Sequence, residues 1–567
     1  MIQIKKGLNK IVDRVEKTNI YIIFAVILFL QILFMLYYCN MKQGFFVDEI
    51  WSYGLSNSYY HAQIWEDNGL ANVKIDPEMF KSYLTVNKGE EFSYGSVIYN
   101  QTHDAHPPFF YMVLHTISSF FPGEFSKWFG LIPNVIYFAI AMYLLLRIVR
   151  CISEKNIFSI LVLVLYGFSI GAVNSVTYVR MYMLLTVWCL FFLLENIQIY
   201  KEEKISVKRF VLLSIATFGG LYTHFFFIIF ACPVVGLMLI KFIREGQPGW
   251  RAFFKYSIAG GIGIICAFGT FPTYLRKLSG KDGNANSSLT HANMRNFSDW
   301  GERIKIYWKD ISSELFGSLW SVILILFLAL LAGYLICNIL YKIRIEKNEK
   351  KIQLIIEKKQ ISEKKIIELK QSYIISISML LVIVFYFLLV CKITVFSSNR
   401  FMMCIYPLIV LEMSILIWET IVHITRKKVM QSVILGVTCV LITGITYFAN
   451  DPEYIYEEKG KNAQVLQEYT DLPVVYIYAS THRILDNALN LMNCKKEIYQ
   501  IELEKIKQNI KEVDASENEM IFYVDTLVSD YGSSVDECLE YVEKELNYNK
   551  AELLGTDDMS NIYLLKR

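Results

Sequence analysis

The sequence lacks the patterns by which metal-binding and nucleic-acid-binding proteins are usually recognised. Its 11 cysteines are scattered, mostly inside apolar runs, and none belongs to a CxxC pair. We therefore expect them to behave as small hydrophobic residues rather than as metal ligands. The formal net charge is only +3, and the basic residues occur in short clusters between apolar runs. This distribution argues against a nucleic-acid partner and is typical of membrane topology signals.

The C-terminal part, residues 451–567, also lacks any catalytic pattern. It has no Gly-rich phosphate-binding loop and no ordered Ser/His/Asp set, and the chain as a whole has no solenoid-type repeat. Apolar runs at 474–478 and 520–524 predict buried strands, while 483–492 and 534–546 have helical spacing. We expect a small α/β domain with an accessory or acceptor-binding role. Whether its two cysteines, Cys494 and Cys538, form a disulfide is left open by the sequence.

Hydrophobic residues, by contrast, are abundant. They make up 54% of the 567 residues, aromatic residues make up 15%, and the mean hydropathy is +0.36. The first long apolar run, residues 20–40, can cross about 30 Å of hydrocarbon at about 1.5 Å per residue. Basic residues precede it, and no small-residue cleavage site follows it. It is predicted to be a retained anchor with a cytoplasmic N-terminus.

The positions of basic clusters predict about eleven spans. Residues 106–121 are too short to cross and are expected to lie at the membrane interface or to re-enter. The predicted spans are residues 20–40, 131–149, 157–177, 181–199, 209–223, 225–243, 254–272, 318–341, 372–392, 401–422 and 431–448. The fold class is thus a polytopic α-helical membrane protein of the plasma membrane with a large first extracytoplasmic loop and a small C-terminal α/β domain.

This topology divides the chain into a membrane domain, residues 1–450, and an extracytoplasmic domain, residues 451–567. The first outside loop covers residues 41–130. A second large outside loop, residues 273–317, includes a Gly, Asn and Ser cluster that we expect to be mobile. Residues 342–371 are rich in Lys and Glu and are predicted to form a solvated or membrane-surface cytoplasmic helix.

Unusual polar residues gather at the outer ends of the predicted spans and in the outside loops. They are Asp48, Glu49, His106, Tyr178, Arg180, Tyr182, His224 and Arg400. Each has an ordinary explanation: solvated carboxylates, arginines that reach the interface, core histidines and interfacial tyrosines. An ionisable side chain at membrane depth nevertheless costs about 2.5–3.5 kcal/mol unless it is paired or wetted. Their shared face therefore indicates an aqueous functional site.

A carboxylate that faces two or three cations at the outer leaflet suits transfer from a lipid phosphate. The carboxylate can take a proton from an acceptor hydroxyl, and the cations can hold the phosphate that leaves.

These motifs, taken in order, resemble those of a known family. They are Asp48-Glu49 after the first span, His106-Pro107-Pro108-Phe109-Phe110-Tyr111, Tyr178-Val179-Arg180-Met181-Tyr182, Tyr222-Thr223-His224-Phe225, and Asn399-Arg400-Phe401 with Pro407. About residues 1–450 resemble the polyprenyl-phosphate-sugar glycosyltransferases with the C-type membrane fold, the class of protein O-mannosyltransferases and lipid A aminoarabinose transferases.

The resemblance implies roles for individual residues. Asp48 corresponds to the general base, and Glu49 to its neighbour in acceptor or metal binding. Arg180 and Arg400 correspond to residues that hold the lipid-linked phosphate, and the loop with Lys281 corresponds to one that closes over the donor.

The sequence also departs from the family pattern. Phe401 follows Arg400 where many relatives have Tyr, and Asp104 offers a second acidic candidate beside His106. No cofactor is assigned, and a divalent metal at Asp48, Glu49 and His106 stays open.

The predicted function is transfer of a sugar from a polyprenyl-phosphate carrier to a hydroxyl acceptor on the outer membrane face, with inversion. Its partners are the lipid-linked sugar, membrane lipids and an acceptor that is a protein, a glycolipid or a cell-envelope polymer. A transporter or lipid-carrier flippase is the main alternative, although transporters tend to place ionisable residues near the membrane midplane. A sensor that binds a ligand through residues 460–567 is a third possibility.

Overall fold

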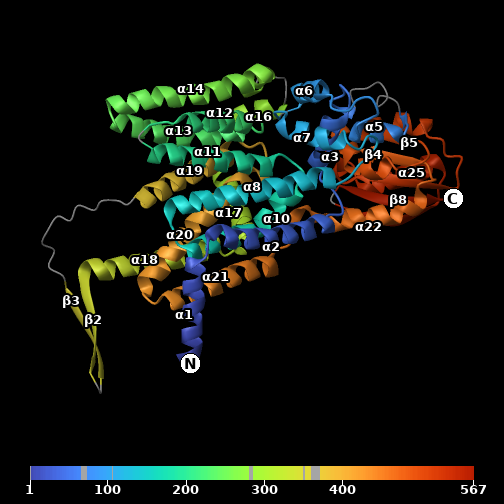
Figure 1. Cartoon of the computed structure of the whole chain (residues 1–567). Helices are drawn as coiled ribbons and strands as arrows, with labels where there is room; N and C mark the ends of the chain where they lie inside the picture. The colour runs from blue at the N-terminus through green and yellow to red at the C-terminus, as the bar shows by residue number, and fades with distance from the viewer. Residues whose placement is uncertain are drawn as a thin grey trace.

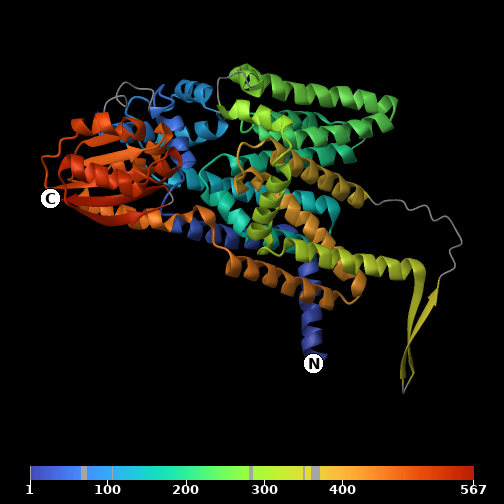
Figure 2. The same ribbon diagram turned by 180° about the vertical axis from the view of Figure 1, so that it is seen from behind.

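The computed structural model describes residues 2–64, 73–104, 106–202, 204–279, 285–348, 351–358, 371–557 and 559–567. A bundle of long helices occupies most of the molecule, and a mixed β-sheet lies at one end of it (Figure 1). A hairpin lies at the opposite end of the bundle, as the view from behind shows (Figure 2). The sheet and the hairpin therefore mark the two ends of the helical bundle.

Eight helices of the described residues are long and apolar enough to cross a membrane. They are α2 (Ile20–Met41), α8 (Trp128–Ile152), α11 (Tyr182–Lys201), α13 (Phe226–Arg244), α14 (Gln247–Thr270), α19 (Gln371–Ile393), α20 (Tyr406–Ile424, with the turn before it) and α21 (Lys428–Ala449). The predicted helical membrane fold is confirmed.

Two further spans are present if each bent helix pair counts as one. The helices α9 (Asn156–Gly167) and α10 (Ile170–Thr177) meet at 54°, and the side chain of Ser169 between them caps α10 by accepting from the Ala172 N–H. The other pair, α17 (Trp300–Phe316) and α18 (Trp320–Leu340), meets at 79°. The one remaining predicted span, residues 209–223, falls on α12 (Val207–Leu221), which has only 15 residues. The count of eleven therefore stays a prediction.

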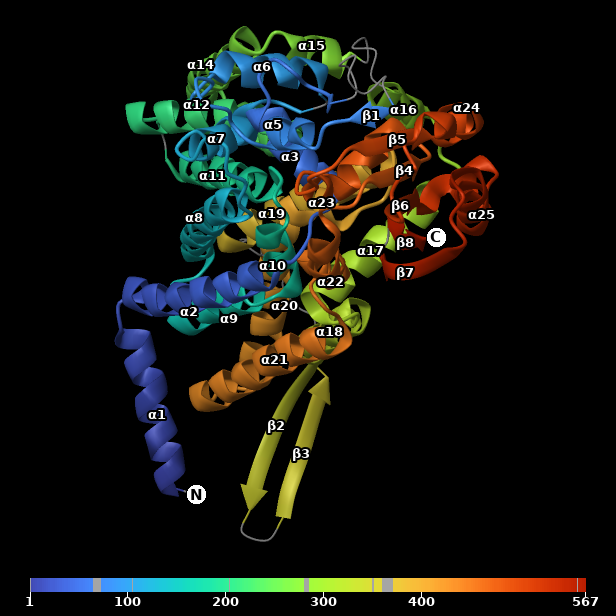
Figure 3. The ribbon, with the colours of Figure 1, turned by 90° about the vertical axis from the view of Figure 1, so that its right-hand side faces the viewer.

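Short helices of the first outside loop cover the end of the bundle that adjoins the sheet. Viewed from that end, α3 (Val47–Asn57) lies between α7 (Phe109–Ser118) and the sheet region (Figure 3). The helices α5 (Glu78–Leu84) and α6 (Tyr94–His103) complete this cap. As expected for residues 106–121, α7 is too short to cross, since it has 10 residues.

The C-terminal α/β domain is confirmed, but its sheet also uses the first outside loop. The strand order is β1-β5-β4-β6-β8-β7. The strands are β1 (Lys74–Ile75), β4 (Val474–Tyr478), β5 (Ile498–Glu502), β6 (Glu519–Asp525), β7 (Lys550–Thr556) and β8 (Ser560–Lys566). Because β1 pairs antiparallel with β5, the sheet is completed by a segment some 400 residues earlier in the chain.

The two faces of this sheet belong to different cores. Ile521 and Tyr523 of β6 pack into the core that continues through the membrane helices, whereas Phe522 and Val524 pack under α25 (Val535–Leu546), as the alternation of a strand requires. Cys538 lies in the second core and Cys494 packs against the first, and both are free thiols. A disulfide between them is therefore absent.

The described chain also contains smaller elements. Among them are α1 (Ile2–Lys17), α15 (Thr273–Leu278), α16 (Ala285–Arg295), α22 (Glu457–Leu466), α23 (Ala488–Leu491), α24 (Ile506–Asn509), and the 3-10 turns η2 (Asn399–Phe401), η4 (Glu453–Ile455) and η6 (Thr481–Asn487). Within residues 273–317, which the sequence predicted to be a second outside loop, residues 285–295 and 300–316 are helical, and residues 280–284 lie outside the described residues.

The helix predicted for residues 342–371 is wrong over its first half. Strands β2 (Tyr341–Asn348) and β3 (Lys351–Lys358) form an antiparallel hairpin there. The sequence 342–346 alternates charged and β-branched residues, which is the period of a strand. Residues 359–370 lie outside the described residues.

Candidate active site

Three polar residues from distant parts of the chain meet beside the first turn of α3. The Asp48 carboxylate on α3 lies 2.6 Å from Nη1 of Arg400, which belongs to η2. Arg180, in the turn between α10 and α11, donates from Nη1 to the Asp48 carbonyl oxygen at 3.0 Å and to Ser52 Oγ at 3.2 Å. The structure therefore brings Asp48, Arg180 and Arg400, which the sequence predicted to share one face, into contact with one another.

Tyrosines line the same site. The hydroxyl of Tyr178 donates to Asp48 Oδ2 at 3.4 Å and accepts a hydrogen bond from Arg400. Tyr182 stacks on Tyr178, with ring centroids 5.9 Å apart. These contacts fix the orientation of Arg400, since its guanidinium also lies 5.6 Å from the centre of the Tyr178 ring.

Charge at the site favours an ionised Asp48. Burial raises the pKa of Asp48, but the neighbouring Arg400 and Arg180 guanidinium groups lower it more, so the pKa lies below its usual value of about 4. The Asp48 side chain is 20% exposed, whereas the two arginines are almost fully buried. An accessible carboxylate thus lies over two buried cations.

Both arginines also keep a free donor. The Nε–H groups of Arg180 and Arg400 are buried and have no hydrogen-bond partner among the described residues. Buried donors are normally satisfied, so unpaired ones need an explanation such as a ligand that binds there. Two guanidinium groups with spare donors are suited to an anion such as phosphate.

Glu49 is not placed at this site. Its side chain is fully buried and lies 3.0 Å from the Lys42 ammonium, and it accepts from the backbone N–H groups of Val179 at 2.7 Å and Phe46 at 2.8 Å. Burial raises the pKa of Glu49, against the opposing effects of Lys42 and the two N–H groups. This carboxylate anchors α3 to the α10–α11 turn.

A second carboxylate lies nearby, as the sequence left open. Asp104 Oδ2 lies 3.0 Å from Nδ1 of His106, and the His106 ring lies 5.3 Å from the ring of His224. Burial lowers the pKa of both histidines, and the pKa of His224 is lowered further by His106 and Arg180. Burial raises the pKa of Asp104, but His106 lowers it more, and the net change is downward. Neutral imidazoles and an ionised Asp104 therefore border the site.

Sequence reasoning missed two contributors. Lys277 of α15 donates to the Gln101 carbonyl oxygen at 2.9 Å and is one of the charges that lower the pKa of Asp104. The resemblance assigned Lys281 to a loop that closes over the donor, and Lys281 lies outside the described residues. The Arg276-Lys277 pair at the end of a predicted span was the signal that could have pointed to it.

The second contributor is η4, which the sequence assigned to the C-terminal domain. Tyr454 stacks on Tyr178 with ring centroids 4.3 Å apart, and its hydroxyl donates to Asn399 Oδ1 at 2.6 Å. The Tyr454 carbonyl oxygen accepts from Lys42 Nζ at 2.8 Å. This turn thus links the Lys42–Glu49 pair to the residues around Arg400.

Among the residues that the structure describes, no group of three or more His, Cys, Asp or Glu side chains is arranged to hold a metal ion. The metal site left open at Asp48, Glu49 and His106 gains no support from this geometry, because Glu49 is held by Lys42 and backbone groups.

Comparison with known proteins defines the fold. No family model and no curated protein sequence matches the chain. Among solved structures, ArnT from Cupriavidus metallidurans in the apo state matches with a TM-score of 0.51 at 8% sequence identity, over 96% of this chain and 97% of that chain. The chain has the fold of ArnT. The structure of ArnT bound to undecaprenyl phosphate matches over the same shares at 8% identity, with a TM-score of 0.48.

The predicted C-type membrane fold is confirmed by this likeness, which extends over the C-terminal sheet as well as the helices. With eight to ten candidate spans among its described residues, the chain is an integral membrane protein.

Proposed function

We propose that this protein is a membrane glycosyltransferase that moves one sugar from a polyprenyl-phosphate carrier to a hydroxyl acceptor on the outer membrane face. The observation that carries the proposal is the accessible Asp48 carboxylate beside two buried arginines with spare N–H donors. The ArnT-like fold supports it. The N-terminus is cytoplasmic and residues 451–567 are extracytoplasmic in this proposal.

The chemistry requires a base and an anion site close together. Asp48 takes the proton from the acceptor hydroxyl as the acceptor oxygen bonds to the anomeric carbon of the sugar. The bond from that carbon to the phosphate oxygen breaks, and its electron pair leaves with the phosphate. Arg180 and Arg400 bind the phosphate and stabilise the charge that develops on it. Attack from the face opposite to the phosphate inverts the anomeric configuration.

The resting contact between Asp48 and Arg400 has a place in this scheme. A donor phosphate that binds Arg400 competes with the Asp48 carboxylate for the same guanidinium. Donor binding would then release Asp48 toward the acceptor hydroxyl. His106, Tyr178, Tyr182 and His224 line the sugar and phosphate positions in this proposal.

The position of the charged residues favours an enzyme over a transporter. Asp48 belongs to α3, which lies at the end of the bundle that adjoins the sheet (Figure 1). Arg180 and Arg400 contact Asp48 from the turns before α11 and α20, outside the long helices. The midplane of broken helices is where transporters usually place such groups.

The experiment is a transfer assay with the purified full-length protein, a polyprenyl-phosphate sugar labelled in the sugar, and a membrane extract as the source of acceptors. We expect donor consumption, polyprenyl phosphate release in equal amount, and label in a hydroxyl-bearing product. Cells that lack the protein should accumulate the donor. Folded protein that consumes no polyprenyl-phosphate sugar, together with normal donor levels in such cells, would overturn the proposal.

A further inference from the structure

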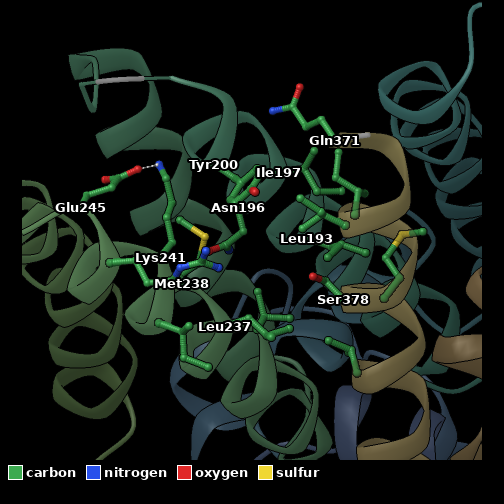
Figure 4. Close-up of a pocket in the computed structure, with 17 residues that line it drawn as sticks. Leu193, Asn196, Ile197, Tyr200, Leu237, Met238, Lys241, Glu245, Gln371 and Ser378 are labelled. Carbon is green, nitrogen blue, oxygen red and sulfur yellow. Dashed lines mark ion pairs between the residues drawn. The ribbon is translucent and has the colours of Figure 1, made fainter. Parts of the chain in front are cut away.

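A groove lies between α11, α13 and α19 at the ends of these helices farthest from Asp48. Each of the three helices has its other end in the candidate site: α11 begins at Tyr182, α13 begins just after His224, and α19 ends shortly before Arg400. The cavity has a volume of about 590 Å³ (Figure 4). It therefore lies at the opposite membrane face from the active site and is separate from it.

The lining changes from apolar to charged along the helix axes. Leu193, Val234, Leu237, Met379 and Val382 line its inner part. Moving toward the helix ends, the lining residues become Tyr200, Lys241, Arg244, Glu245 and Gln371. The close-up shows Glu245 and Gln371 at one end of the cavity and Leu237 at the other (Figure 4).

The depth of the apolar part matches part of one leaflet. From Val234 to Lys241 the helix rises about 10 Å, at about 1.5 Å per residue, and one leaflet contributes about 15 Å of hydrocarbon. A groove with a polar mouth and an apolar interior of this depth fits a lipid whose head group lies at the membrane surface and whose acyl chain lies along the helices.

The two basic residues at the mouth differ in how many protein partners they have. Lys241 donates to the Ile199 carbonyl oxygen at 3.0 Å and lies 3.5 Å from Glu245. The Arg244 side chain is exposed and forms no hydrogen bond or ion pair with any described residue. Because Glu245 offsets one of the two cations, the mouth carries a net positive charge with one free guanidinium.

We propose that this groove binds an anionic glycerophospholipid of the leaflet opposite the active site. One acyl chain lies along Leu193, Leu237 and Met379, and the phosphate binds Arg244 with support from Lys241. Basic pockets between membrane helices suit anionic lipid head groups. The bias of basic residues toward the cytoplasmic ends of membrane helices would explain the position of Arg244 at this face. It would not explain the apolar groove beside Arg244.

The lipid would act as a wedge between three helices whose other ends carry site residues. It does not take part in sugar transfer, so the proposal stands or falls separately from the proposed function. Its occupancy should be measurable as bound lipid and as thermal stability.

The experiment uses the purified full-length chain in detergent, with phosphatidylglycerol and phosphatidylcholine as separate probes, read by native mass spectrometry and thermal unfolding. Arg244→Gln removes the free cation, and Leu237→Trp or Ser378→Trp fills the groove. Arg251→Gln is the matched control, because Arg251 is exposed near the start of α14 and does not line the groove.

We expect wild-type protein and Arg251→Gln to retain phosphatidylglycerol and to be stabilised by it. Arg244→Gln should bind it about fivefold more weakly, as expected for the loss of one basic residue at an anionic lipid surface. The groove-filling variants should lose the stabilisation altogether. If both groove-filling variants fail to fold, the difference in phosphatidylglycerol binding between Arg244→Gln and Arg251→Gln tests the proposal by itself.

Three results would overturn the proposal. Equal stabilisation by phosphatidylcholine would exclude recognition of the anionic head group. An equal loss of phosphatidylglycerol binding in Arg251→Gln would show that the lipid responds to the overall positive charge of this membrane face and not to the groove. Displacement of phosphatidylglycerol by equimolar polyprenyl phosphate would show that the groove holds the carrier lipid instead.

Discussion

Asp48 and Glu49 are neighbours in the chain, yet their carboxylates lie on different sides of α3 and in different surroundings. On one side, Asp48 is 20% exposed and faces two arginines with spare donors. On the other, Glu49 has no exposed surface and is held by Lys42 and two backbone N–H groups. A carboxylate that has used its acceptor capacity in the protein cannot also serve a substrate. The difference separates the reacting group from the group that holds its helix in place.

The strongest test removes the charge of Asp48. Asp48→Asn should lower kcat for sugar transfer by about 10³-fold, because general-base catalysis contributes roughly that much and the amide cannot accept the proton. The labelled-donor assay measures it, with protein folding checked by thermal unfolding. Asp104→Asn is the matched comparison and should cost at most about tenfold. A larger loss in Asp104→Asn would assign the base to Asp104.

The converse test is Glu49→Gln. It should lower the free energy of unfolding by about 3 kcal/mol, because the buried Lys42 ammonium loses its carboxylate. Thermal or denaturant unfolding measures the change, while kcat per folded molecule should stay close to wild type.

Its control is Glu458→Gln, which breaks a surface pair with Lys461 and should cost less than about 1 kcal/mol. A stable Glu49→Gln variant without transferase activity would reverse the roles given to the two carboxylates.

Arg400→Gln tests the anion side of the site. It should lower kcat/KM by about 10²-fold, since it removes one donor to the phosphate that leaves. Arg295→Gln, at an exposed position of α16, should leave the rate unchanged. Binding of polyprenyl phosphate to the variant, measured by its inhibition of transfer, should weaken in parallel. Unchanged inhibition would exclude Arg400 from the phosphate site.

The smallest expected effect is the response of the wild-type enzyme to acid. Because the pKa of Asp48 is held below its usual value by Arg400 and Arg180, the base stays ionised as the pH falls from 7 to 5. A group with a pKa below about 4 loses less than about 10% of its ionised form at pH 5. The kcat/KM profile should therefore be flat over this range.

Replacement of Arg400 by Gln should raise the pKa of Asp48 and move the loss of activity to higher pH, whereas Arg400→Lys should not. A wild-type profile that already falls below pH 6 would contradict an Asp48 base paired with Arg400.

Much of the candidate site was predictable because most of its polar residues lie close to the end of an apolar run. Counting spans from basic clusters was enough to bring Asp48, Arg180 and Arg400 to one side of the membrane. The ordered motifs then predicted the fold that ArnT shares. Counting spans predicts how deep a residue lies in the membrane. It does not predict which way the residue faces around its helix axis, or which side chains it contacts.

The parts that escaped prediction depend on contacts across the whole chain. Glu49 looked like a second catalytic carboxylate, because nothing near it in sequence shows that Val179 and Lys42 would close over it. Tyr454 stacks on Tyr178 across 276 positions. The strand β1 has only two residues, which is too short for any periodic signal.

That two-residue strand also sets an order of assembly. The pairing of Lys74 with Tyr499 joins the first outside loop to a segment that is synthesised only after every membrane helix. The cap over α3 is therefore closed last, when η6 of the C-terminal domain packs behind it. A chain cut after residue 456 would keep every arginine and carboxylate of the site. It would nevertheless lose the packing of η6 against α3, the helix that carries Asp48.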